Sequence, residues 1–311
     1  MATLLLTHPD CLNHVTPDGH PERVARLQAI LDALDAPQFA PLVRREARLA
    51  TDAEVLRAHP PAHLDRIRAA APSYGGTSLD PDTHMSEGSL AAALRAAGAN
   101  VQAVDAVMTG AAKNAFAAVR PPGHHAEAMR PMGFCLFGNV VIGARHALEA
   151  HGLSRVAIID FDVHHGNGTQ DLVWDDPRIL FASTHQMPLY PGTGRAEEAG
   201  AHGQIVNVPL PAGADGAQFR RQITRLVLPA VAAHKPEMIF ISAGFDAHRD
   251  DPLANLALDV ADFTWVTREI LALAAEVAGG RVVSTLEGGY DLDALAASTA
   301  AHVEVLMEFS G

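Results

Sequence analysis

The chain has 311 residues, of which 48% are hydrophobic, so one large buried core is feasible. Aromatic residues make up only 5%, and the core must therefore be built mainly from Ala, Val, Leu and Ile. The formal net charge of -13 argues against tight binding to nucleic acids or anionic membranes, because neutralising phosphates requires Lys and Arg.

The cysteine count and the N-terminus indicate the compartment. Cys11 and Cys135 allow one disulfide at most and no disulfide framework, and a reducing compartment fits them best. The first residues carry no basic cluster and are typical of a strand, not of a signal peptide. No apolar run approaches the ~20 residues that a bilayer span needs. We expect a soluble, cytoplasmic protein.

Short apolar runs alternate with helical segments along the chain, with no internal repeat and no linker. The predicted strands are Thr3–Thr7, Ala115–Val119, Val156–Asp162, Ile179–Thr184, Ile205–Pro209, Met238–Ala243 and Val282–Leu286. The predicted helices are Pro21–Leu34, Ser86–Thr109, Asn139–Ala150, Ala217–Ala233, Phe263–Val277 and Leu292–Phe309. Largely apolar strands alternating with helices are typical of βαβ units and a parallel sheet. We therefore expect one α/β domain over residues 1–311.

Five loops rich in Gly, Pro and His lie at or shortly after predicted strand ends. They are Arg120–Gly133, His164–Gly168, Tyr190–Gly194, Ala243–Leu253 and Glu287–Tyr290. Ligands of open α/β sheets bind outside the carboxyl ends of the strands. The five loops are therefore predicted to converge on one site.

Candidate metal ligands close the third of these strands. Side chains alternate along a strand, so Asp160, Asp162 and His164 project to one side. Zinc accepts such oxygen and nitrogen ligands. A group of polar side chains at the end of an apolar strand costs folding free energy unless the side chains are paired or bound to a metal ion. Asp246, after another apolar strand, fits a third ligand or a helix cap equally well. Three ligands with an open position describe a catalytic zinc site.

Two further clusters carry groups suited to catalysis. His124 and His125 follow Pro121-Pro122-Gly123, a rigid loop frame, and tandem imidazoles there suit general acid–base catalysis better than a chance surface pair. In Glu287–Tyr290 the glycines allow close approach of a ligand, and the Tyr290 hydroxyl is a possible oxyanion donor. Read alone, that segment is also compatible with an ordinary turn.

Together these clusters resemble the zinc-dependent histone deacetylase superfamily, in order and in spacing. The matching motifs are HPERVARL at His20–Leu27, RPPGHHA at Arg120–Ala126, DFDVHHGNGTQ at Asp160–Gln170, YPGTG at Tyr190–Gly194, AGFDAH at Ala243–His248 and EGGY at Glu287–Tyr290. The motif HHGNGTQ, with Asn at position 167, resembles the corresponding motif of the class II branch and its bacterial relatives. The resemblance covers nearly the whole chain and implies the arginase–deacetylase fold, a parallel sheet of about eight strands with helices on both faces.

The resemblance also implies roles for the catalytic residues. Asp162, His164 and Asp246 would bind one zinc ion. His125 would act as general base and acid, with His124, paired to Asp160, as its electrostatic partner. Tyr290 would polarise the amide carbonyl. The implied reaction is removal of acetyl or other acyl groups from lysine side chains or related amines by activated water.

Further roles follow from the same resemblance. The implied substrate-binding residues are Gly133, Phe134, Tyr190, Leu253, Gly288 and Gly289. One or two structural potassium ions are implied, one of them held by the side chains of Asp160 and Ser183 together with the backbone carbonyls of Asp160, Asp162, His164 and Thr184. Arg23 resembles an arginine of an acetate exit channel.

Two other functions compete with this reading. An arginase-like ureohydrolase with two manganese ions would need a bridging Asp where Gly166 stands. A non-catalytic acyl-lysine binder would not need the full set of ligand, base and Tyr positions.

The substrate is left open between acyl-lysine, acetylpolyamines and other small amides. Leu253 stands where polyamine-selective relatives carry Glu, which favours acyl-lysine, while Asp80 or Asp82 could grip a substrate at the rim. A homo-oligomer is compatible with the sequence, whereas nucleic-acid and membrane partners are not expected.

Overall fold

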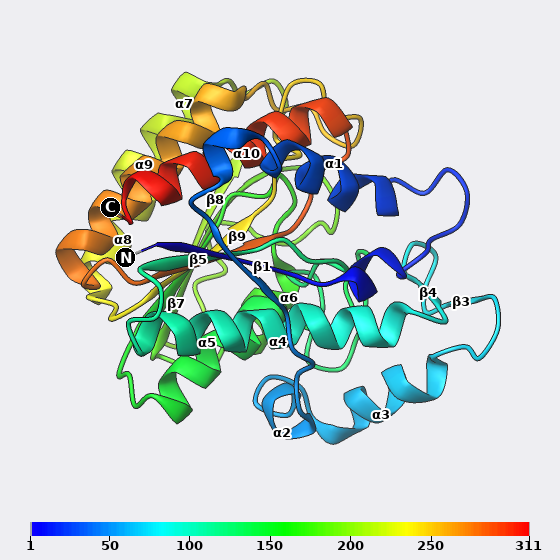
Figure 1. The fold of residues 1–311 in the computed structure, drawn as a ribbon. Helices are drawn as coiled ribbons and strands as arrows, with labels where there is room; N and C mark the ends of the chain where they lie inside the picture. The colour runs from blue at the N-terminus through cyan, green and yellow to red at the C-terminus, as the bar shows by residue number, and fades with distance from the viewer. Residues whose placement is uncertain (1, 311) are drawn as a thin grey trace.

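The computed structural model describes residues 2–310 and places an eight-stranded parallel sheet between two layers of helices (Figure 1). The order across the sheet is β2-β1-β5-β10-β9-β6-β7-β8. The strands are β1 (Thr3–Thr7), β2 (Val43–Glu46), β5 (Asn114–Ala117), β6 (Val156–Asp160), β7 (Ile179–Gln186), β8 (Ile205–Leu210), β9 (Ile239–Ala243) and β10 (Val282–Leu286). This arrangement matches the predicted parallel α/β fold.

The helices divide between the two faces of the sheet. Those of one face are α1 (Val24–Leu34), α7 (Gly216–Gln222), α8 (Leu228–His234), α9 (Val260–Val277) and α10 (Leu292–Glu308). The opposite face carries α4 (Ser89–Met108), α5 (Asn139–Ala150) and α6 (Asn167–Val173), with α2 (Asp52–Val55) and α3 (Pro61–Ala70) beyond them. Strands such as β6 and β9 are buried along their whole length, which is why they are apolar except for Asp160 in β6 and Ser242 in β9. No helix within residues 2–310 is long and apolar enough to cross a membrane.

Several predicted boundaries differ from the structure for local reasons. Strand β6 ends at Asp160, two residues early, because the Asp162 N–H donates to the Asp160 carboxylate at 3.0 Å. The predicted helix Ala217–Ala233 is wrong as one element, because a π-helical segment, Ile223–Val227, separates α7 from α8. Pro229 lacks an N–H and cannot continue the hydrogen-bond ladder of α7, so the register shifts before it.

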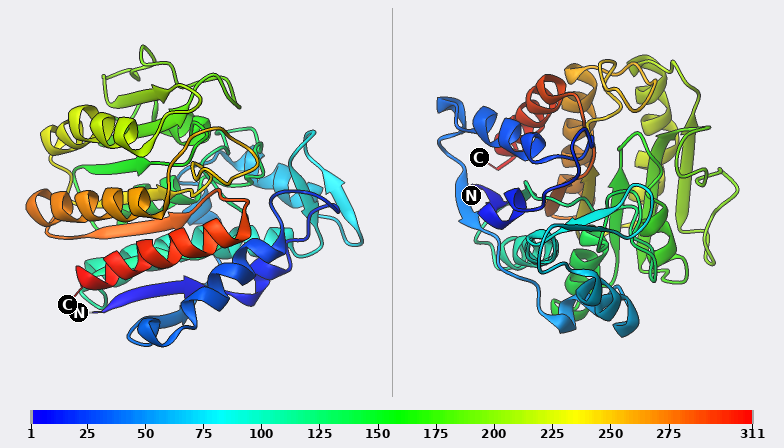
Figure 2. Two further views of the ribbon diagram at one scale, coloured as in Figure 1. Left: turned by 90° about the horizontal axis from the view of Figure 1, so that it is seen from above. Right: turned by 90° about the vertical axis from the view of Figure 1, so that its right-hand side faces the viewer.

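The elements that the sequence did not predict are short or exposed. Strand β2 pairs with β1 at the edge of the sheet, and its sequence VRRE has three exposed residues. A separate antiparallel hairpin of β3 (Gly76–Ser78) and β4 (His84–Ser86) projects from the carboxyl edge of the main sheet (Figure 2). The turn of that hairpin reaches the mouth of the site described next, because Asp82 lines its cavity.

Candidate functional site

A cavity of about 250 Å³ opens at the carboxyl edge of the sheet, where the predicted loops converge. The residues that line it are Asp82, His125, Gly133, Phe134, His164, Leu189, Tyr190, Leu253 and Tyr290. They come from loops that follow β5, β6, β7, β9 and β10 and from the β3–β4 turn. A parallel sheet brings these distant segments together because all of its strands end at the same edge.

Asp162, His164 and Asp246 form a compact group that can hold a metal ion, and His164 is the member of the group that lines the cavity. Their candidate ligand atoms lie within 4.8 Å of one another, and all three residues are buried. His164 Nδ1 lies 3.2 Å from the Asp162 carboxylate and 3.0 Å from that of Asp246. Burial disfavours a charged imidazole, but these two carboxylates outweigh it and raise the pKa of His164 to about 10.

The donor set of this group fits zinc. Two carboxylates and one imidazole are ligands that zinc accepts, and a three-residue set leaves a coordination position open. The surrounding backbone is close-fitting, since a Cβ atom at Gly244 would overlap the Asp162 carboxylate and one at Gly288 would overlap that of Asp246. The Gly288 N–H donates to Asp162 Oδ2 at 2.8 Å, which orients the carboxylate. Binding a metal ion would require the His164 proton to leave.

The two histidines of the RPPGHH loop lie side by side, with ring centroids 4.0 Å apart, but their environments differ. His124 Nδ1 is 3.0 Å from Asp160 Oδ2. Burial opposes its charge, yet the carboxylates of Asp162 and Asp160 hold the pKa of His124 well above its usual range. Burial and the neighbouring charges of His124 and His164 hold the pKa of His125 well below its usual range. The pair therefore combines a cation with a neutral base.

Asn167 fixes which nitrogen of His125 is basic. The Asn167 amide nitrogen donates to Glu127 Oε1 at 2.7 Å, so its carbonyl oxygen faces His125 Nδ1, also at 2.7 Å. That oxygen can only accept, and Nδ1 therefore carries the proton. The lone pair of His125 resides on Nε2. Asn167 was quoted in a motif, but the sequence alone did not connect it with His125.

Replacing Asn167 with Asp is expected to raise the pKa of His125, because an anion beside the ring favours imidazolium. Activity that needs neutral His125 is complete above its pKa and is lost as pH falls through it. The acidic limb of the kcat/KM profile should therefore move to higher pH in Asn167→Asp. Asn207→Asp, a change at a buried amide that contacts Gln170 instead, should leave the limb in place. If the acidic limb of the kcat/KM profile stays at the same pH in Asn167→Asp, His125 is not the titrating base.

Glu287 binds the backbone of the loop that carries His124 and His125, a role that the sequence did not predict. Its Oε2 accepts the N–H groups of Gly123 at 2.7 Å and His124 at 3.1 Å, and its Oε1 accepts the Ser242 hydroxyl at 3.2 Å. Glu287 is fully buried at the end of β10. A carboxylate that closes an apolar strand was the signal used for Asp160, and it would have identified Glu287 as well.

Tyr290 lies on the cavity wall as a neutral phenol, because burial raises its pKa well above the usual range. Asp251 anchors it, with Oδ2 accepting the Tyr290 N–H at 2.7 Å and Oδ1 accepting that of Leu253 at 3.0 Å. The Arg26 guanidinium lies 4.7 Å from the centre of the Tyr290 ring. The same guanidinium donates to the Glu287 carbonyl at 2.6 Å.

A buried ionic network lies behind this wall. Glu22 accepts from both Arg26, at 3.0 Å, and Arg120, and His14 Nε2 lies 3.3 Å from Glu22 Oε2. The arginine that packs on Tyr290 is Arg26. Arg23, which the resemblance suggested for an acetate exit channel, lies three residues earlier in the chain. Arg23 lines a separate cavity of about 380 Å³ on the other side of Tyr290. Helix α1 explains the difference, because it turns Arg26 inward as one of its buried residues.

Asp251→Asn should loosen the Tyr290 loop. Asn keeps one acceptor oxygen where Asp251 now serves several backbone N–H groups, so at least one buried donor loses its partner. We expect a loss of about 1–3 kcal/mol in unfolding free energy and a lower kcat. Urea unfolding and steady-state kinetics measure both effects. Asp250→Asn, at the exposed neighbouring position, should change neither by a comparable amount.

Three of the predicted substrate-binding residues, Gly133, Phe134 and Tyr190, line the cavity. The Phe134 ring stands 5.9 Å from that of Tyr290, and the Tyr190 ring 5.2 Å from that of His125. Gly133 has a φ of +56°, and a Cβ there would lie 2.5 Å from His125 Cδ2, so glycine is required. Its carbonyl accepts the Cys135 thiol at 3.2 Å.

The structure separates the remaining predicted substrate contacts. Leu253 lines the cavity, whereas Gly288 and Gly289 lie behind its wall, where they bond to Asp162 and Arg26. Asp82 also lines the cavity, whereas Asp80 accepts backbone N–H groups of its own turn. Of the two acidic residues in this turn, Asp82 is therefore the one that lines the cavity.

The predicted potassium ligands lie next to one another in the sheet. Asp160 pairs with Ser183 across β6 and β7, and both are fully buried. Ser183 Oγ lies 2.9 Å from His185 Nδ1, while Thr184 Oγ1 is buried without a hydrogen-bond partner among the described residues.

Both cysteines, Cys11 and Cys135, are free and buried. The one disulfide that the sequence allowed is therefore not formed.

Comparison with known proteins identifies the family. Residues 20–306 match the model of the histone deacetylase domain. The chain is 40% identical to histone deacetylase 14, chloroplastic, of Arabidopsis thaliana, over 98% of this chain and 77% of the relative. It is 39% identical to a histone deacetylase-like amidohydrolase of Pseudomonas aeruginosa, over 88% of this chain and 73% of the relative. The crystal structure of the HDA15 HD domain superposes with a TM-score of 0.93 at 36% identity, covering 99% of this chain and 88% of that one. The chain belongs to the histone deacetylase family.

Proposed function

We propose that this protein is a zinc-dependent amidohydrolase that removes acetyl or other acyl groups from lysine side chains or closely related amines. The observation that carries the proposal is the arrangement of three groups around one narrow cavity. A neutral His125 and the Asp162–His164–Asp246 group lie at its floor, and the Tyr290 phenol stands on its wall. Relatives whose names state deacetylase or amidohydrolase activity support a hydrolytic role.

Each residue of the site has a separate role in the proposed reaction. When bound by Asp162, His164 and Asp246, zinc supplies Lewis acidity toward water and the amide carbonyl. His125 Nε2 takes a proton from the attacking water, and the Tyr290 hydroxyl donates a hydrogen bond to the oxygen that becomes negative. His125, now protonated, passes that proton to the departing amine nitrogen. Burial, together with the positive charge at His124, keeps the pKa of His125 low, so that His125 is neutral before the reaction and can act as a base.

The cavity favours an extended aliphatic chain next to the amide. Phe134 and Tyr190 supply its aromatic walls, and Leu253 adds an apolar contact. Asp82 provides a carboxylate at the rim, suited to a backbone N–H of a peptide. The same carboxylate would also attract a second amine, and it is the feature that supports an acetylpolyamine as the alternative substrate.

An arginase-like reaction has less support, because the site has no room for a bridging carboxylate. Gly166 stands where that residue would be, and a Cβ there would overlap the Asp160 carboxylate. A non-catalytic acyl-lysine binder would not need a base with a defined tautomer.

The decisive experiment compares substrates on protein of known metal content. The protein loaded with one zinc per chain is assayed with an acetyl-lysine peptide, a trifluoroacetyl-lysine peptide, acetylspermidine and acetylputrescine. We expect the highest kcat/KM for an acyl-lysine peptide. Preference for the acetylpolyamines would favour the alternative, and the absence of turnover on every substrate would favour a binder. Activity that requires two manganese ions per chain would overturn the proposal.

The proposed function also includes a potassium ion, a single catalytic domain and a cytoplasmic location. We propose a potassium ion between Asp160 and Ser183, supported by their pairing and by the unbonded hydroxyl of Thr184. We also propose that residues 1–311 act as one catalytic domain in the cytoplasm, either alone or as a homo-oligomer. The free cysteines support that compartment.

A further inference from the structure

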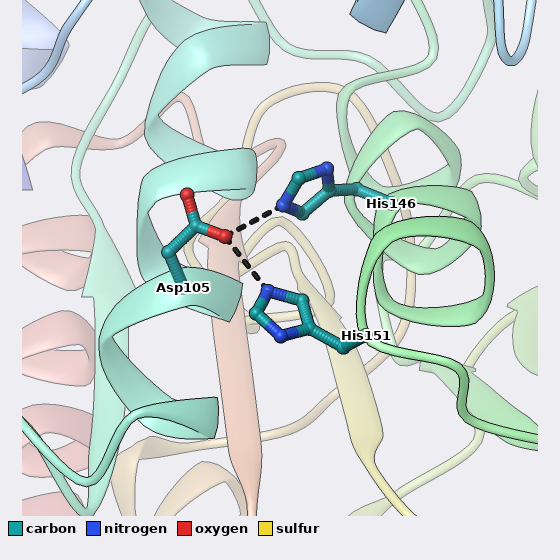
Figure 3. Close-up of side chains that lie close together, drawn as sticks. All are labelled: Asp105, His146 and His151. Atoms are coloured by element: carbon teal, nitrogen blue, oxygen red, sulfur yellow. Dashed lines mark hydrogen bonds and ion pairs between the residues drawn. The ribbon is translucent and has the colours of Figure 1, made fainter.

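A second group of metal-binding side chains lies between helices α4 and α5 (Figure 3). Asp105 belongs to the last turn of α4, His146 to α5, and His151 is the C-terminal cap of α5. Asp105 Oδ1 is 2.6 Å from His146 Nε2 and 2.8 Å from His151 Nε2. The three candidate ligand atoms lie within 4.8 Å of one another. One carboxylate oxygen thus faces the outer nitrogens of two imidazoles.

This cluster lies away from the catalytic cavity. Helix α5 begins at Asn139, shortly after the loop that carries Phe134, and its 12 residues extend about 18 Å. His151 caps its far end, close to Val156, where β6 begins at the amino edge of the sheet. None of the three residues lines the catalytic cavity. The reaction proposed above therefore has no use for them.

We propose that Asp105, His146 and His151 form an accessory site for a zinc-like divalent transition-metal ion. Two imidazole nitrogens and one carboxylate oxygen are a donor set that such ions prefer. Ligand atoms around tetrahedral zinc are about 3.3 Å apart. The two distances from Asp105 Oδ1 to the imidazole nitrogens therefore need to lengthen by about half an ångström on metal binding. The side chains of Asp105 and His151 are 44% and 21% exposed, which leaves an open side for water as a further ligand.

Arg57 sets how tightly this site can bind. Its Nη1 lies 3.0 Å from His146 Nδ1, and because a guanidinium cannot accept, Nδ1 is the acceptor. The proton of His146 therefore resides on Nε2, the nitrogen that would face the metal. Metal binding moves that proton to Nδ1, so Arg57 must withdraw from the ring. It keeps a partner when it does, since its Nε lies 3.2 Å from Glu149 Oε2. Arg57 thus competes with the metal ion.

The test measures zinc bound per chain by equilibrium dialysis at buffered free zinc, followed by elemental analysis. Zinc-loaded holoenzyme should take up one further equivalent at micromolar free zinc. His151→Gln and Asp105→Asn should lose that equivalent, and His202→Gln, a change at an exposed histidine outside the cluster, should retain it. Arg57→Gln should tighten the accessory site by about tenfold, because glutamine can accept from Nδ1–H.

The comparison is between variants, so its result does not depend on the catalytic ion. An equal zinc content in the unchanged protein and in His151→Gln would overturn the proposal, as would equal affinity in Arg57→Gln. Thermal unfolding with and without added zinc provides a second readout. We expect zinc to raise the Tm of the holoenzyme but not that of His151→Gln, whose partly exposed side chain can change without a large loss of packing.

Discussion

Replacing His125 with Gln is expected to lower kcat/KM by about 10²–10⁴-fold, the range found for loss of a positioned general base and acid. The glutamine amide N–H can still donate to the Asn167 carbonyl oxygen, but the amide cannot take the proton from water or return it to the amine. Neutral His125 requires deprotonation, so the acidic limb of the pH profile should disappear with the imidazole. The measurement is kcat/KM from pH 5 to pH 9 on an acyl-lysine peptide, assuming only that the peptide is turned over.

The control for His125→Gln is the metal content of the same protein. His125 is not one of the three ligand residues, so we expect zinc to bind Asp162, His164 and Asp246 as before. A variant that loses zinc together with activity would assign His125 to metal binding instead. A variant that keeps both its zinc and more than a tenth of its activity would exclude His125 as the base.

The parallel sheet was predictable because its central strands are buried on both faces. Burial of that kind favours largely apolar runs, such as Ile239–Ala243, in which Ser242 is the one polar residue. Strand β2 lies at the edge, where one face meets solvent, and its VRRE sequence has no such signature. The broken helix around Pro229 was missed because hydrophobic spacing persists through a π-helical turn.

That the candidate metal and base residues gather at one cavity was predictable for a different reason. Asp162 and His164 follow a buried strand that ends at Asp160, and the alternation expected of an extended backbone was enough to group their side chains. The residues that adjust them come from elsewhere in the chain. Asn167 reaches His125 across 42 positions, and Arg26 reaches the Glu287 carbonyl across 261. The hydrophobic periodicity of the sequence does not predict such pairings, because they depend on which strand ends and helix faces the fold brings together.

Replacing Tyr290 with Phe should reduce kcat by about 10²–10³-fold with little change in KM, the expected cost of one lost oxyanion donor. The substitution removes only the hydroxyl, and the ring contacts with Arg26 and Phe134 remain. Because Tyr290 stays protonated throughout the accessible pH range, its loss should lower the rate equally at every pH. That uniform loss distinguishes Tyr290 from His125, whose replacement changes the shape of the profile.

The chain offers matched controls for Tyr290→Phe, since it has only three tyrosines. Tyr74→Phe removes a hydroxyl at a side chain that is 89% exposed, and it should not alter kcat. Tyr190→Phe removes one from the opposite cavity wall and should cost less than about tenfold, because a wall residue contacts the substrate chain without donating to the oxyanion. An equal loss in Tyr190→Phe and Tyr290→Phe would mean that either phenol can reach the reacting carbonyl. A loss confined to Tyr290→Phe would assign oxyanion stabilisation to the residue that Asp251 and Arg26 hold in place, and would explain why the fold commits two buried charged groups to one loop.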